Sequence, residues 1–92
     1  MQKSLKQDVV NSINLICDFY GVSLDAIMTS SIRTQIVTKV RTFVLYRLVT
    51  YNGLTVKEAS KALKLPYVAA NDACKRMKRF PLLLVEYNKI IT

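Results

Sequence analysis

Lysine and arginine are the side chains of this sequence whose number and placement indicate a chemistry, and that chemistry is the binding of polyanions. The chain of 92 residues has a net charge of +8. Residues 33–79 hold eleven Lys or Arg against two acidic residues, whereas residues 1–32 have a net charge of −1 and residues 80–92 are neutral. Because the whole excess lies in the middle of the chain, we expect a nucleic acid as partner. A solvated surface that only keeps a small protein soluble is the alternative.

Residues arranged for catalysis or metal binding are missing from the sequence. Histidine, the usual general base and the commonest metal ligand, is absent. Cys17 and Cys74 lack the spacing of a zinc site and are expected to be small buried hydrophobes. With Gly21 and Gly53 as the only glycines, a glycine-rich phosphate loop cannot be built. We therefore expect no enzyme activity, no cofactor and no metal.

The basic residues are predicted to lie on two short helices joined by a tight turn, within residues 54–79. Asn52-Gly53 is a turn signal that ends the preceding helix. Thr55 and Glu58 have the spacing of a capping box, which predicts that the first helix of the pair begins there. Pro66 suits the first position of the second helix. That helix is predicted to bury small or apolar residues, namely Ala70, Ala73, Cys74 and Met77.

Other segments are predicted to support this pair in a single domain spanning residues 1–92. Apolar residues at helical spacing predict an amphipathic helix over residues 4–20, ended by Gly21, and a short helical turn from Ser23. A long central helix is predicted over residues 34–51, with an apolar stripe of Ile36, Val37, Val40, Phe43, Val44, Leu48 and Tyr51.

The apolar tail, residues 82–92, fits either a helix or a short strand. Such a tail must be covered, by the domain's own core or by another subunit, and we favour the domain's own core. No apolar run approaches the roughly 20 residues of a membrane span, and the first ten residues lack a signal-peptide pattern, so a cytoplasmic location is expected.

The order of these features resembles the C-terminal DNA-binding domain of the bacterial replication initiator DnaA, an all-helical Trp-repressor-like fold. The resemblance covers about residues 9–77 and leaves residues 81–92 as an extension. Its segments are Phe19–Leu24, Thr29–Arg33, Ile36–Arg41, Leu54–Ser60 and Ala73–Met77. Where that family carries Asp-His-Thr-Thr-Val, which reads bases in the major groove, this chain has Pro66-Tyr67-Val68-Ala69-Ala70, allowing for a one-residue deletion.

Two sets of residues are predicted to contact DNA. Arg33 resembles the family's minor-groove arginine, while apolar side chains of the second helix suit thymine methyl groups and Asn71 suits adenine. The predicted base-proximal residues are Arg33, Tyr67, Val68, Ala69 and Asn71. The predicted backbone contacts are Ser30, Ser31, Lys39, Arg41, Lys57, Lys61, Lys64, Lys75 and Arg76.

These predictions lead to two functional hypotheses. In the first, the chain is a stand-alone helix-turn-helix module that binds duplex DNA and regulates replication or transcription. It would act at the nucleoid of a bacterial or phage-infected cell, as phage or mobile-element regulators do. In the second, a DnaA-like fold binds a protein partner or dimerises through the apolar start of its second helix and its tail. RNA remains open as a ligand, although exposed aromatic residues for base stacking are few.

Overall fold

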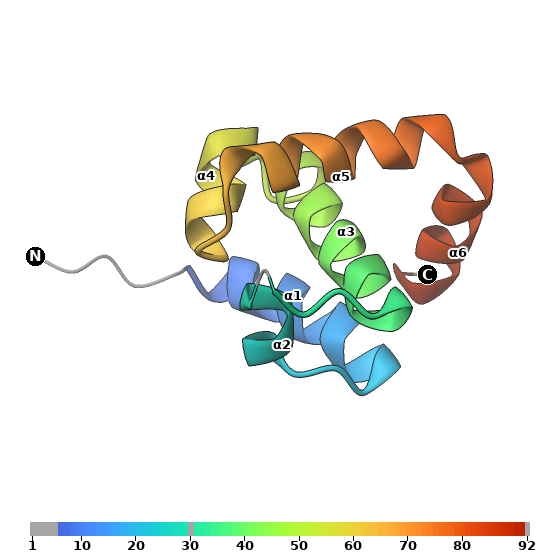
Figure 1. Ribbon diagram of the computed structural model, residues 1–92, viewed down its shortest axis with the longest axis horizontal. Coiled ribbons are helices and arrows are strands. Elements are labelled where there is room, and N and C mark those ends of the chain that lie inside the picture. The colour runs from blue at the N-terminus through green and yellow to red at the C-terminus, as the bar shows by residue number, and fades with distance from the viewer. Residues whose placement is uncertain (1–5, 30, 92) are drawn as a thin grey trace, which may run out of the picture.

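The computed structural model describes residues 6–29 and 31–91, and all regular secondary structure in these ranges is helical. Six helices follow one another: α1 (Gln7–Tyr20), α2 (Leu24–Met28), α3 (Gln35–Thr50), α4 (Val56–Ala62), α5 (Tyr67–Arg79) and α6 (Pro81–Ile91). Figure 1 shows α3 in the middle, between α1 with α2 on one side and α4 with α5 on the other. The all-α fold class predicted from the sequence is confirmed. No helix of the described ranges is long and apolar enough to span a membrane.

The helix boundaries follow from local residues that satisfy free backbone groups. Gly21 ends α1 in a left-handed conformation with a φ of 66°. The side chain of Thr34 accepts a hydrogen bond at 3.4 Å from the amide of Val37 and caps α3. Thr55 and Glu58 form the predicted capping box at the start of α4, with reciprocal bonds of 3.1 and 2.9 Å.

Two predicted helix starts need adjustment. Pro66 is the N-cap of α5 rather than its first helical residue, because its ψ of 149° is extended and the helix begins at Tyr67. Within the described residues α1 begins at Gln7, and the predicted start at residue 4 lies outside them.

Helix α3 supplies the centre of the hydrophobic core. Val40, Phe43, Val44 and Leu48 are completely buried, as the predicted stripe requires. Two members of that stripe are exposed instead, namely Ile36 (42%) and Tyr51. Ile36 lies in the first turn of α3, and Tyr51 is its C-cap residue.

Both cysteines are free thiols, and they are buried to different extents. Cys17 is buried in the core, and desolvation raises the pKa of its thiol to about 11, so at neutral pH it acts as a small apolar residue. Cys74 on α5 is only half-buried, although burial raises its pKa too.

The tail is a helix that packs on the core of its own chain. Tyr87 and Ile90 of α6 are buried. The Tyr87 ring makes edge contacts with Phe43 and Tyr46 of α3, with centroid distances of 5.7 and 5.1 Å. The preferred prediction of self-packing therefore holds for one face of α6.

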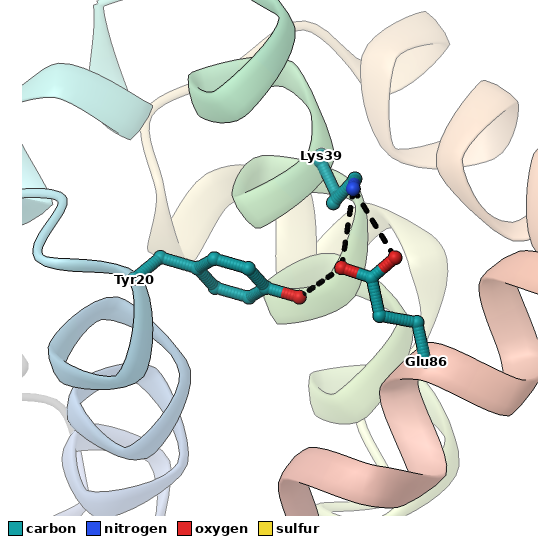
Figure 2. A network of polar contacts seen from close by, with 3 residues as sticks. All are labelled: Tyr20, Lys39 and Glu86. Carbon is teal, nitrogen blue, oxygen red and sulfur yellow. Dashed lines mark hydrogen bonds and ion pairs between the residues drawn. The ribbon is translucent and has the colours of Figure 1, made fainter.

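A polar network fastens α6 to the rest of the domain (Figure 2). The Glu86 carboxylate accepts a hydrogen bond from the Tyr20 hydroxyl of α1 and pairs at 3.1 Å with Nζ of Lys39 on α3. The Tyr20 bond and then the charge and hydrogen bond of Lys39 lower the pKa of Glu86. Desolvation and then the bond to Glu86 raise the pKa of Tyr20. Three helices distant in sequence are thus joined by one carboxylate.

Candidate nucleic-acid interface

Helices α4 and α5 form the predicted pair, joined by a turn whose backbone is well bonded. The amide of Leu65 donates to the carbonyl oxygen of Ser60 at 2.8 Å, and Leu65 itself is buried. Lys64 adopts a φ of 55°, and it is the only non-glycine residue with positive φ in the described ranges. Ala70, Ala73 and Met77 of α5 are buried, so the small residues let α5 pack closely and leave its opposite face outward.

Most of the predicted cationic contacts lie at the surface. The exposed members are Arg33, Lys57, Lys61, Lys64, Lys75 and Arg76. At the start of α5, Tyr67 and Val68 are exposed, with 66% of Val68 accessible, whereas Ala69 and Asn71 are half-buried. The beginning of α5 therefore presents an apolar surface beside cations contributed by α4, α5 and the turn.

A continuous groove lies between α3 and α5, and we call it the α3–α5 groove. It consists of two adjoining hollows of about 360 and 650 Å³ that share Arg33, Thr38, Thr42 and Arg76. The start of α5 contributes Val68 and Ala69 to one wall, and Ile36 and Leu83 line the far end. Arg33 precedes α3 and Arg76 lies near the end of α5, so residues distant in sequence give one hollow two guanidinium groups.

The predicted exposure of Arg41 is wrong. Its side chain is buried, and desolvation followed by the nearby charge of Arg33 lowers its pKa. The guanidinium holds the segment between α2 and α3, because it donates bonds of 2.8 to 3.2 Å to the carbonyl oxygens of Ala26, Ile27, Thr29 and Ile32. Arg41 therefore shapes the segment that carries Arg33, and we no longer expect it to contact phosphate directly.

Three other residues were predicted to contact the DNA backbone, namely Lys39, Ser31 and Ser30. Lys39 is half-buried and lines the groove, but its ammonium group is paired with Glu86. Ser31 is exposed beside Arg33. Ser30 lies outside the described residues.

Sequence reasoning missed Asp72, which is exposed and lines the groove. It is the only acidic side chain among the described residues that line the two hollows. The signal was present in the helical spacing, because Val68, Asp72 and Arg76 recur every four residues and so share a face of α5. Thr38 and Thr42 were missed as well, and the hydroxyl of Thr42 donates to the carbonyl oxygen of Thr38 at 2.8 Å.

Comparison of the chain with protein-family models, curated proteins and solved structures found no match. The functional argument therefore depends on the residues and geometry of this chain.

Proposed function

We propose that this chain binds duplex DNA, with the start of α5 in the major groove and Arg33 in the adjacent minor groove. The observation that carries the proposal is that Arg33 and Arg76 line one groove beside the exposed start of α5. A fold similar to the DnaA C-terminal domain belongs to this proposal, as does a role in regulating replication or transcription. The supporting features are the central α3, the α4–α5 pair and the preceding segment that carries Arg33.

The proposed placement puts one helix in the major groove. The major groove is about 12 Å wide and admits one helix. With α5 there, the sugar-phosphate strand that separates the major from the minor groove would lie along the α3–α5 groove, between α5 and Arg33. Arg76 would then bind that strand, and the exposed cations Lys57, Lys61, Lys64 and Lys75 would bind phosphates on either side.

Base preference would arise from the α5 residues nearest the groove. Val68 and Ala69 offer apolar contact with thymine methyl groups, and Asn71 offers a bidentate bond to adenine. The Asp72 carboxylate repels phosphate but can accept a hydrogen bond from the amino group of cytosine, so it favours an orientation in which it faces a base edge. A sequence preference different from that of the initiator family follows, because the family's polar reading residues are replaced.

Selection of bound duplexes from a random pool tests the proposal. We expect an enriched motif, and an affinity for it that falls steeply with salt, with a slope of about −0.9 per phosphate contacted. Single-stranded RNA of matched length serves as competitor, and preference for it would move the assignment to RNA. Absence of duplex binding at low salt, or a flat salt dependence, would contradict the proposal.

A second candidate function is the binding of a protein partner. Leu82 of α6 is 82% exposed, the largest exposed fraction among the large hydrophobic residues described, and Val68 and Tyr67 form another apolar surface. Such surfaces are typical of protein interfaces. A dimer mass in light scattering of the purified chain would support this function. So would capture of a protein partner that Val68→Ser weakens.

A further inference from the structure

Two surface segments of the domain differ in charge. Residues 7–32 contain three aspartates and no Lys or Arg, whereas Arg76, Lys78 and Arg79 occupy the last turn of α5. On α1, Leu15, Asp18 and Phe19 are exposed at the i, i+3, i+4 spacing of a single helix face. We call these three residues the acidic face. Phe19 is 62% exposed, and its ring makes an edge contact with the Tyr20 ring at a centroid distance of 5.1 Å.

A complementary hollow lies where α5 meets α6. It has a volume of about 580 Å³ and is lined by Arg76, Phe80, Pro81, Leu82 and Leu83, and we call it the tail pocket. Its apolar residues form most of the lining, while the charge at its edge is positive, from Arg76 and the neighbouring exposed Arg79. No acidic side chain of the described residues lines it. The tail pocket thus has positive charge at its edge, whereas the acidic face has the negative charge of Asp18.

We propose that the tail pocket receives the acidic face of a second copy of this chain, so that copies associate head to tail. Phe19 of one copy would enter the pocket against Leu82 and Phe80, and Asp18 would face Arg79, which the DNA proposal does not use. The association covers the exposed apolar groups on both surfaces and pairs opposite charges. A symmetric contact of pocket with pocket would instead bring Arg76 and Arg79 against their own copies, which like-charge repulsion disfavours.

The acidic face and the tail pocket share no residue. Each copy can therefore insert its acidic face into one neighbour while its own tail pocket binds the acidic face of another. Such a heterologous contact produces an open row of copies, or a ring where the rotation closes, rather than a symmetric dimer. The net charge of +8 opposes the row in free solution. At physiological ionic strength the Debye length is about 8 Å, so salt screens this long-range repulsion more than the close contacts at the interface. On duplex DNA the phosphates would neutralise the repulsion, and this last step rests on the proposed function.

Sedimentation velocity across a wide range of protein concentration tests the proposal without DNA. We expect the mean mass of the wild type to rise with concentration, whereas Phe19→Ser and Leu82→Ser each remain monomeric. An equimolar mixture of the two variants should form a 1:1 dimer that grows no further, because each variant keeps one working surface. Asp18→Lys should remain monomeric alone, as Phe19→Ser does, and should form a 1:1 dimer when it is mixed with Leu82→Ser.

Several outcomes would overturn head-to-tail association. A wild type that stays monomeric at every concentration excludes it, and a mixture without a dimer does the same. Persistent dimers of either single variant would indicate a symmetric contact instead. Circular dichroism and thermal melting verify that Phe19→Ser and Leu82→Ser remain folded, as the exposure of both side chains predicts. Binding of each variant to a duplex long enough for one copy is a separate measurement, so its failure would count against the DNA proposal alone.

Discussion

Nε of Arg41 donates a hydrogen bond of 2.8 Å to the carbonyl oxygen of Ile27, the buried residue of α2. The same guanidinium also bonds the carbonyl groups of Ala26 in α2 and of Thr29 and Ile32 in the segment before α3. A buried cation is costly unless its donors are satisfied, and here backbone carbonyls accept from Nε and Nη2. Arg41 therefore fixes the path of the segment from which Arg33 projects, which links the interior of the domain to the candidate interface.

Replacing Arg41 by lysine keeps the charge but loses the planar set of donors. We expect Arg41→Lys to lower the free energy of unfolding by about 2–3 kcal/mol, since several bonds to a charged donor are lost at a buried site. Chemical denaturation measures this effect. Arg47→Lys is the matched control on the same helix, because the Arg47 Nε bonds only Ser12 at 3.2 Å and its guanidinium lies over the exposed ring of Tyr51. Unchanged stability in Arg41→Lys together with weaker DNA binding would restore Arg41 as a direct phosphate contact.

Lys64 occupies a left-handed backbone conformation that costs a residue with a Cβ roughly 1–2 kcal/mol and costs glycine little. Lys64→Gly should therefore raise the free energy of unfolding by about 0.5–1 kcal/mol, after the extra entropy of glycine in the unfolded chain is subtracted. It should also weaken DNA binding and reduce the salt slope by about 0.9, the value for one lost phosphate contact. Thermal melting and binding titrations measure the two effects, which have opposite signs.

Lys61→Ala is the control for this prediction, because Lys61 is an exposed cation in the last turn of α4 with helical backbone. It should weaken binding without the gain in stability. A Lys64→Gly variant that is more stable and binds DNA as well as the wild type would remove Lys64 from the interface.

The sequence predicted the parts of this fold that depend on neighbouring residues. Gly21, Thr55 and Glu58 act within one helical turn of themselves, so their roles were readable from spacing. The role of Arg41 was not, because its partners lie 9 to 15 residues earlier and become partners only after the segment folds back. Its burial could have been read from the helical spacing, because Arg41 lies four residues after Val37 and three before Val44, on the buried face of α3.

In the candidate interface too, some features follow from local spacing and others only from how the helices pack. The outward direction of Lys57, Lys61 and Lys75 follows from helical period alone. The groove itself depends on how α3 crosses α5, which brings Arg33 and Arg76 to one hollow, and no local pattern records that crossing. The pairing of Lys39 with Glu86 was equally hidden, since it joins helices far apart in the chain.

Glu86 makes stability depend on pH in the acid range. Its pKa is lowered in the folded state, so its contribution is present above the unfolded value of about 4.3 and is lost as the pH falls through the folded value. Because the group is more than a third exposed, we expect Glu86→Gln to cost only about 0.5–1 kcal/mol at neutral pH. The difference from wild type should shrink as the pH falls below the unfolded value, as denaturation at several pH values will show. A difference that stays constant as the solution becomes more acidic would exclude titration of Glu86 as the cause.

Tyr20 titrates in the opposite range. Its pKa is raised by burial and by Glu86, so the stabilising neutral phenol persists below the unfolded value of about 10, and its contribution is lost as the pH rises above that value. We therefore expect the wild type to lose stability above about pH 10 and Tyr20→Phe to lose less. An equal loss of stability at alkaline pH in both proteins would show that groups other than Tyr20 cause it.

Arg33 and Arg76 line the same groove, so their contributions to DNA binding should depend on each other if one phosphate strand lies between them. In a double-mutant cycle of Arg33→Ala and Arg76→Ala, we expect a coupling free energy of about 0.5–3 kcal/mol. The salt slope should fall by about 0.9 for each arginine that binds a phosphate. Lys78→Ala is the control, because Lys78 is an exposed cation of α5 outside the groove, and its effect should be additive with that of Arg33→Ala. If the losses of binding free energy for Arg33→Ala and Arg76→Ala are additive, the two arginines bind separate parts of the ligand. The DNA strand would then not lie along the α3–α5 groove.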